Sequence, residues 1–171
     1  AAHAGPIFHM LGYAAFCGIP TMAAVSIYSV EGAAGLVGRL VFGVAADRFG
    51  PRRMIMAGLL LQALAIPVYL AVRDIRDFYL LAMVFGMAYG GVMPLYAVLA
   101  REYFSQRIMG TVLGAATLLS SLGMALGPLG GGWVFDTFCS YAWLYIGSAA
   151  LAAGAVAISL AFPPSPGVRP A

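Results

Sequence analysis

The sequence predicts an all-α protein whose helices cross a membrane several times. Of its 171 residues, 63% are hydrophobic and 9% are charged, whereas a typical soluble domain has about 45 to 50% apolar and about 25% charged residues. Its uncharged stretches also reach the length of about 20 residues that a helix needs to cross about 30 Å of hydrocarbon. These two observations favour a polytopic membrane protein with the lipid bilayer as its solvent.

The first apolar stretch, residues 1–46, predicts two helices rather than one. Its only formal charges are Glu31 and Arg39, and a single helix of that length would measure about 69 Å, more than twice the hydrocarbon thickness. We expect a break at residues 18–21, because glycine loosens the backbone, proline suits a first helical turn and threonine can cap it. The result is a partial span over 1–17 and a full span over 21–46.

Four further apolar runs predict four further spans, which gives five full spans and one partial span. Short loops that hold most of the charge separate the runs, which cover 54–72, 78–100, 108–135 and 137–162. The Pro-Pro-Ser-Pro segment that begins at Pro163 ends the last helix, and residues 163–171 are predicted to form a tail.

The arginines predict which ends of the spans face the cytoplasm, because cytoplasmic loops carry an excess of Lys and Arg. One set of loops holds six arginines, namely Arg48, Arg52, Arg53, Arg101, Arg107 and Arg169. The other set holds only Arg73 and Arg76, beside two aspartates. The Asp47–Arg53 loop and the tail are therefore predicted to be cytoplasmic, in a multi-pass protein of the plasma or inner membrane. Because the arginines form no basic patch, we expect no nucleic-acid partner.

Glycine spacing predicts close helix packing, and prolines inside the spans predict bending. The pairs Gly86 and Gly90, Gly110 and Gly114, and Gly123 and Gly127 are each four residues apart, which lets helix backbones approach one another in lipid. Proline interrupts the backbone hydrogen bonds of a helix. The residues expected to act as hinges are Gly90, Gly91, Pro94 and Pro128. The plainer interpretation is that the glycines serve packing alone.

The loop after the second predicted helix has the features of a conformational latch. Asp47 lies at a helix end where the macrodipole disfavours an anion, so it needs a cationic partner or the N-terminus of another helix. Gly50 permits a tight reversal, and Pro51 suits the start of the next helix. The latch residues are Gly43, Asp47, Arg48, Gly50, Arg52 and Arg53. The alternative is a positively charged cytoplasmic loop in which Asp47 has no special role.

The pattern Gly-x3-Asp-Arg-x-Gly-x-Arg-Arg, which begins at Gly43, resembles the signature loop of the major facilitator superfamily of transporters. In that superfamily the loop joins the second and third helices of each six-helix half. The resemblance therefore implies that residues 1–17 are a truncated first helix. It also implies that the chain is a C-terminal half, whose partner is a missing N-terminal six-helix half.

Two further segments resemble the monocarboxylate-porter branch and the similar oxalate-formate antiporters. They are Phe85-Gly86-Met87-Ala88-Tyr89-Gly90-Gly91, and Leu126-Gly127-Pro128 followed by Asp136 and Tyr141. In that branch an arginine of the eighth helix engages the substrate carboxylate, and the matching residue here is Arg39. The resemblance thus implies that Arg39 binds substrate.

Arg39 is also a candidate on physical grounds. It lies eight residues before Asp47 and therefore about 12 Å into the membrane. A charge there costs about 2.5 to 3.5 kcal/mol on insertion scales, so it normally faces a cavity or a partner. The guanidinium group suits a carboxylate, which it can bind with two parallel hydrogen bonds. The alternative is an arginine that reaches the membrane surface or braces Asp47.

Three further residues are candidates for the same cavity. Glu31 lies eight residues from Arg39 and about 80° around the helix, and it is the proton-coupling candidate. The family usually has an acid one turn before the arginine, but that position is Gly35 here. His9 and Tyr89 are candidate substrate ligands, although His9 could equally satisfy its ring on a backbone carbonyl.

Other aromatic residues predict contacts with the membrane rather than with a substrate. Tyr141, Trp143 and Tyr145 occur together near the predicted start of the last span. Tyrosine and tryptophan are enriched where a membrane meets water. We therefore expect these three side chains to anchor the chain at the interface.

These features together predict secondary active transport of a small organic anion, monocarboxylate-like, by alternating access and coupled to protons. The dispersed His, Cys and acidic residues form no catalytic constellation, so we expect neither an enzyme nor a cofactor or metal site. One alternative is a transporter of the same superfamily for another small solute, such as a drug or a sugar. Another is a half-size accessory membrane protein without transport of its own.

Overall fold

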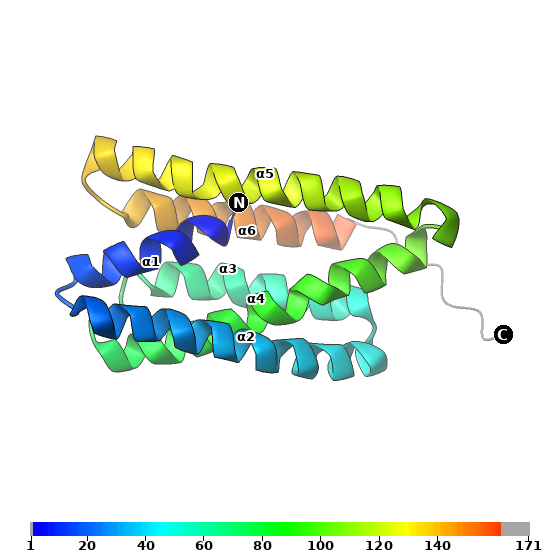
Figure 1. Cartoon of the computed structure of the whole chain (residues 1–171), viewed down its shortest axis with the longest axis horizontal. Helices are drawn as coiled ribbons and strands as arrows, with labels where there is room; N and C mark the ends of the chain where they lie inside the picture. Colours follow the sequence, from blue (N-terminus) through cyan, green and yellow to red (C-terminus); the bar gives the residue numbers. More distant parts are fainter. Residues whose placement is uncertain (1, 162–171) are drawn as a thin grey trace.

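Residues 2–161, the part of the chain that the structure describes, fold into six α-helices and one short 3-10 helix (Figure 1). The structure is a computed structural model. The helices are α1 Ala4–Phe16, α2 Thr21–Phe49, α3 Pro51–Val68, α4 Ile75–Tyr103, η1 Gln106–Ile108, α5 Met109–Phe138 and α6 Ala142–Ala161. These residues contain no strand, and the predicted all-α class is confirmed. The predicted tail, 163–171, lies outside the described residues.

A short connection separates α1 from α2 at the expected Gly-Ile-Pro-Thr segment. Helix α1 ends at Phe16, and α2 begins at Thr21, directly after Pro20. Gly18 has a φ of 86°, which a residue without a side chain adopts at no steric cost. The same local chemistry that predicts the break therefore accounts for its geometry.

One residue joins α2 to α3. Helix α2 continues past the expected end at residue 46 as far as Phe49, and its cap is Gly50 with a φ of 86°. The backbone N–H of Gly50 donates to the carbonyl of Ala46 at 2.8 Å. Pro51 is the first residue of α3. Glycine thus makes the reversal, and proline opens the next helix.

Four stretches are long and apolar enough to cross a membrane, judged by length and composition: α2, α4, α6 and the stretch Gln106–Phe138 that includes α5. Helix α3 has 18 residues, of which the second and third are Arg52 and Arg53, and α1 has 13 residues. The full span expected over 54–72 and the partial span over 1–17 stay predictions.

Helices α2 and α4 approach each other closely because glycines lie at their contact. Gly86 of α4 lies against the backbone of Glu31, and Gly90 lies against the backbone of Gly35. A methyl group at either α4 glycine would collide with the facing backbone. This contact fits the four-residue spacing of Gly86 and Gly90. It also brings the part of α2 around Glu31 and Gly35 against α4.

Helix α5 differs from α4 because most of its surface is exposed. Gly131 is its one buried residue, and leucines such as Leu119, Leu122 and Leu129 are exposed. A methyl group at Gly110 or Gly114 would meet no atom of the described chain within 4 Å. Within residues 2–161, the packing expected from this second glycine pair is therefore absent. Figure 1 shows α5 along one edge of the bundle.

The larger of the two buried hydrophobic clusters lies toward the end opposite the Gly50 turn and is rich in aromatic rings, and the smaller one includes Phe42, Ala46 and Ile55 on the side of that turn. Phe78, Phe85 and Tyr145 are each at most 1% exposed. The interfacial anchoring expected of Tyr145 is therefore wrong, because α6 turns this side chain into the core. Trp143, two residues earlier, is 59% exposed.

Candidate functional site

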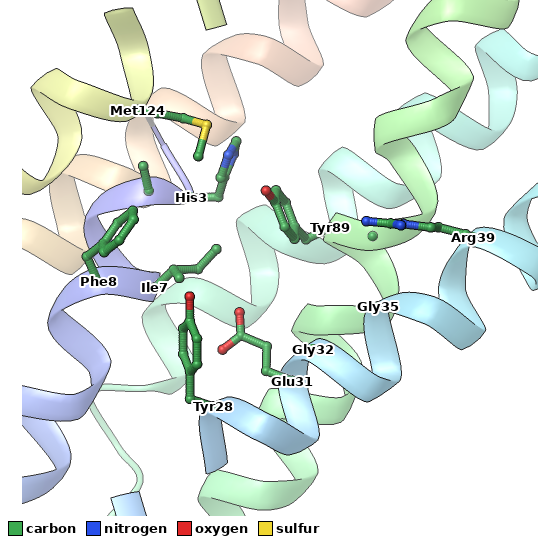
Figure 2. A pocket seen from close by; sticks show the side chains of 12 residues that line it. His3, Ile7, Phe8, Tyr28, Glu31, Gly32, Gly35, Arg39, Tyr89 and Met124 are labelled. Atoms are coloured by element: carbon green, nitrogen blue, oxygen red, sulfur yellow. The ribbon is translucent and has the colours of Figure 1, made fainter. Parts of the chain in front are cut away.

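A cavity of about 190 Å³ lies where α1, α2 and α4 meet (Figure 2). It contains four of the residues that the sequence predicts for a site: Glu31, Arg39, Tyr89 and Gly90. The other lining residues are His3, Ala4, Ile7, Phe8, Tyr28, Gly32, Gly35 and Met124. The lining thus combines one acidic and one basic side chain with aromatic and aliphatic groups.

Helix α2 supplies both formal charges of the cavity from one face. Tyr28, Glu31, Gly35 and Arg39 follow one another at intervals of three or four residues, which places them on the same side of a helix. Figure 2 shows Tyr28 and Glu31 side by side and the Arg39 side chain extended toward Tyr89. Helical spacing therefore brings both charged side chains to one cavity. The eight-residue separation does not by itself make them an ion pair.

Glu31 and Arg39 differ in their exposure. Glu31 is 6% exposed, and its Oε2 atom makes no hydrogen bond within the described residues. Arg39 is exposed in this chain. A buried carboxylate without a partner is strongly unfavourable, so Glu31 is suited to exchange a proton or to receive a cation. Arg39 is free to turn its guanidinium group toward an anion.

Tyr89 reaches the cavity from α4 and contacts His3, the residue that precedes α1. Its ring centroid lies 4.6 Å from that of His3, and the ring planes are inclined by 43°. The Nε2 atom of His3 is buried without a hydrogen-bond partner in the described part of the chain. The pair forms an aromatic wall with polar atoms available to a ligand.

His9 lies outside the cavity lining. Its Nε2 hydrogen-bonds the carbonyl oxygen of Pro128 at 3.0 Å, and a methyl group at Gly131 would lie 2.7 Å from its ring. The glycine therefore leaves room for the imidazole between α1 and α5. This is the alternative in which the ring is satisfied by a backbone carbonyl, and we leave His9 out of the proposed binding set.

The predicted hinge residues have different surroundings. Gly90 lies against the backbone of α2, and a methyl group at Gly91 would lie 2.5 Å from the ring of Phe42. Pro94 and Pro128 lie inside α4 and α5. The glycines thus permit close packing in this structure, and hinge bending at the four positions stays a prediction.

The predicted latch residues lie around the Gly50 turn. A second cavity, of about 440 Å³, is lined there by Phe49, Gly50, Pro51, Arg52, Arg53, Met56 and Glu102. The Nη2 atom of Arg52 donates to the carbonyl oxygens of Ser159 at 3.4 Å and Leu160 at 3.3 Å. These carbonyls belong to the last turn of α6, where a cation is favoured. Asp47, Arg48 and Arg53 are exposed.

Tyr28, His3 and Met124 are among the side chains of the first cavity that sequence reasoning missed. Tyr28 precedes Glu31 by three residues, so helical spacing from the predicted Glu31 would have found it. His3, which directly precedes α1, and Met124 of α5 approach the cavity only through the packing of these helices. No local signal in the sequence identifies them.

Comparisons with known proteins identify a family. The profile described as Major Facilitator Superfamily matches residues 5–171. An uncharacterized MFS-type transporter of Bacillus subtilis, YuxJ, is 35% identical over 130 residues, which is 75% of this chain and 33% of that protein. A multidrug resistance protein B homolog of Mycobacterium tuberculosis is 34% identical over 130 residues, which is 75% of this chain and 23% of that protein.

A third relative is named as a transporter of a different solute. A triacylglyceride transporter of Mycolicibacterium smegmatis is 29% identical over 123 residues, which is 70% of this chain and 22% of that protein. The aligned segment thus spans a third or less of each of the three relatives. None of the three is named for a monocarboxylate.

Proposed function

The chain belongs to the Major Facilitator Superfamily, and on that premise we propose that it is the C-terminal half of a secondary transporter. The proposed transporter moves a small organic anion by alternating access, coupled to protons, and the chain is neither an enzyme nor a cofactor-binding protein. The observation that carries the proposal is the cavity that Glu31, Arg39 and Tyr89 line together. In the whole protein this cavity faces the N-terminal six-helix half.

Arg39 is the proposed substrate ligand. Its guanidinium group is permanently charged and presents a planar fork of donors that fits a carboxylate. The neighbouring Tyr89 ring, toward which the side chain extends in Figure 2, offers an apolar face for the rest of a small acid. Arg39 therefore selects for charge, and the wall around it selects for size and polarity.

Glu31 is the proposed proton carrier. The resemblance to monocarboxylate porters leads us to expect an acid at position 35, which is Gly35 here. Glu31 lies one turn before that position. Glu31 and Gly35 are four residues apart, so they lie on the same side of α2. Protonation removes the charge of a buried carboxyl group, and this change links proton uptake to the charge balance of the cavity.

The Gly50 turn is the proposed cytoplasmic latch. Arg52 connects it to the last turn of α6 through two backbone carbonyls, while Asp47 is exposed and available to the other half. A loop that is fixed to one half and exposes an acid to the other can favour one conformation of the pair.

The proposal is tested by uptake of labelled short-chain carboxylates into liposomes that contain the full-length protein. Arg39→Ala should reduce uptake by at least about tenfold, since loss of one partner of a charge pair costs about 2 to 5 kcal/mol. Arg107→Ala is the matched control, because Arg107 is exposed in η1. Equal uptake by the wild type and Arg39→Ala would remove the carboxylate role.

A second candidate function is transport of a larger apolar solute. Two observations favour it: the multidrug and triacylglyceride transporters among the relatives, and the apolar lining residues Ile7, Phe8 and Met124. In that case carboxylates would not compete with the substrate, and Arg39→Ala would leave apolar solute transport unchanged. The same uptake assay therefore separates the two candidates.

A further inference from the structure

Three oxygen atoms in the interior of the bundle lack a hydrogen bond within residues 2–161. They are Oε2 of Glu31 and the hydroxyl oxygens of Tyr69 and Tyr145. The side chains are 6%, 2% and 0% exposed, respectively. Buried hydroxyl and carboxyl groups are almost always hydrogen-bonded, and internal water commonly supplies the bond where protein groups do not.

Tyr69 and Glu31 pack against adjacent residues of α4. Gly86 lies against the backbone of Glu31, and the ring of its neighbour Phe85 lies 6.2 Å from the ring of Tyr69 at an inclination of 81°. Of the three core tyrosines Tyr69, Tyr145 and Tyr13, Tyr69 is therefore the one that Phe85 and Gly86 connect to Glu31.

The phenols continue in order toward the end of the bundle opposite the Gly50 turn. The rings of Tyr69 and Tyr145 are stacked at 5.7 Å, and those of Tyr145 and Tyr13 lie 5.2 Å apart. The Tyr13 hydroxyl accepts a hydrogen bond from Nη1 of Arg73 at 2.7 Å. Arg73 is exposed in the connection between α3 and α4, so the row of phenols ends at the surface.

We propose that Tyr69, Tyr145 and Tyr13, with water bound between their hydroxyls, conduct protons between the Glu31 carboxyl group and the surface beside Arg73. This proton track rests on the proposed role of Glu31 as proton carrier, and it adds the route by which the proton arrives. The track lies inside this half of the transporter. It therefore gives Glu31 a connection to one side of the membrane that does not pass through the substrate cavity.

Each step of the track conserves charge at the phenols. Water bound at Tyr13 gives a proton to the hydroxyl oxygen, which releases its own proton toward Tyr145, and the same exchange follows at Tyr69. The last water gives its proton to the Glu31 carboxylate. One proton enters beside Arg73, one O–H bond forms at Glu31, and every tyrosine ends as a neutral phenol.

The other groups around Glu31 define which further routes its carboxyl group has for exchanging a proton. The residue before α1 is His3, α2 contributes Tyr28 and Arg39, and α4 contributes Tyr89, all to the same cavity. Tyr69, which directly follows α3, is on the core side. Exchange through the cavity is thus the competing route, and it does not involve the Tyr69 hydroxyl.

The test measures hydrogen–deuterium exchange at Glu31 in the purified full-length protein by infrared spectroscopy, without substrate. The carboxyl band of Glu31 is identified by its loss in Glu31→Gln. Tyr69→Phe and Tyr145→Phe keep the rings and remove the hydroxyls, and Tyr96→Phe, at a half-exposed position of α4, is the control. The track predicts that the two core variants slow the exchange by about 10²-fold, the lower end of the contribution of a positioned proton-transfer group.

Two outcomes separate this inference from the proposed function. Exchange at the wild-type rate in both core variants, each with a wild-type melting temperature, would show that protons reach Glu31 through the cavity and would overturn the track. Slowed exchange in a protein that takes up no carboxylate would retain the track and remove only the anion as substrate.

Discussion

Arg39 and Glu31 line one cavity from the same helix, eight residues apart, and Oε2 of Glu31 makes no hydrogen bond to Arg39 or to any other described residue. Two opposite charges near a membrane midplane normally pair with each other or with backbone groups. Their separation here leaves the guanidinium group available for an anion and the carboxyl group available for a proton.

Replacement of Glu31 by Gln should uncouple transport from protons. The amide keeps the size of the side chain and cannot take up a proton, so uptake driven by a pH gradient should be lost while exchange of substrate across the membrane continues. Both rates are measured in the same proteoliposomes, with and without a gradient. If gradient-driven accumulation persists in Glu31→Gln, the proton passes through another group.

Replacement of Arg39 by Lys should impair carboxylate binding although the positive charge is retained. Lysine is a point charge that cannot form two parallel hydrogen bonds to a carboxylate. We expect an affinity between those of the wild type and Arg39→Ala, measured as the concentration dependence of uptake. Wild-type affinity in Arg39→Lys would indicate that charge alone is recognised.

Gly90→Ala should destabilise the bundle, whereas Gly110→Ala should not. The added methyl group at Gly90 collides with the backbone of Gly35, but at Gly110 it meets no described atom within 4 Å. Overpacking costs about 1 to 3 kcal/mol, while alanine in an open helical position gains up to about 1 kcal/mol. Thermal unfolding in detergent compares the two variants. Equal melting temperatures would show that α2 and α4 do not pack as described.

Asp47→Asn should change conformational exchange more than substrate affinity. Asp47 is exposed next to the turn that Arg52 connects to α6, and it lies eight residues beyond the cavity residue Arg39 on α2. Spectroscopic probes placed on the two halves of the full-length protein report the exchange rate, and a binding titration reports affinity. A loss of affinity with unchanged exchange would contradict the latch.

Local sequence was sufficient to predict the connections between helices and one face of the site. The Gly-Ile-Pro-Thr segment separates α1 from α2, Gly50 makes the next reversal, and helical spacing places Glu31 and Arg39 on one side of α2. Each of these features depends on residues within a few turns of one another. Backbone conformation and side-chain direction at such distances follow from the residue types themselves.

The remaining features depend on how distant helices pack, which the residue pattern does not determine. The hydrogen bond between His9 and Pro128 joins positions 119 residues apart, and the contribution of Met124 to the cavity depends equally on where α5 lies. Tyr145 has the composition of an interfacial anchor and is nevertheless 0% exposed. An aromatic side chain near a helix end suits either environment, and only the neighbouring helices decide between them.

Direct binding of matched ligands tests the central role of Arg39. The purified full-length protein is titrated with a short monocarboxylate and with the neutral amide of the same size, and the titration is repeated with Arg39→Gln and with the control Arg107→Gln. The account predicts that the wild type and the control prefer the carboxylate by at least about tenfold, and that Arg39→Gln binds both ligands equally weakly. Equal binding of the two ligands by the wild type, or an unchanged preference in Arg39→Gln, would contradict it.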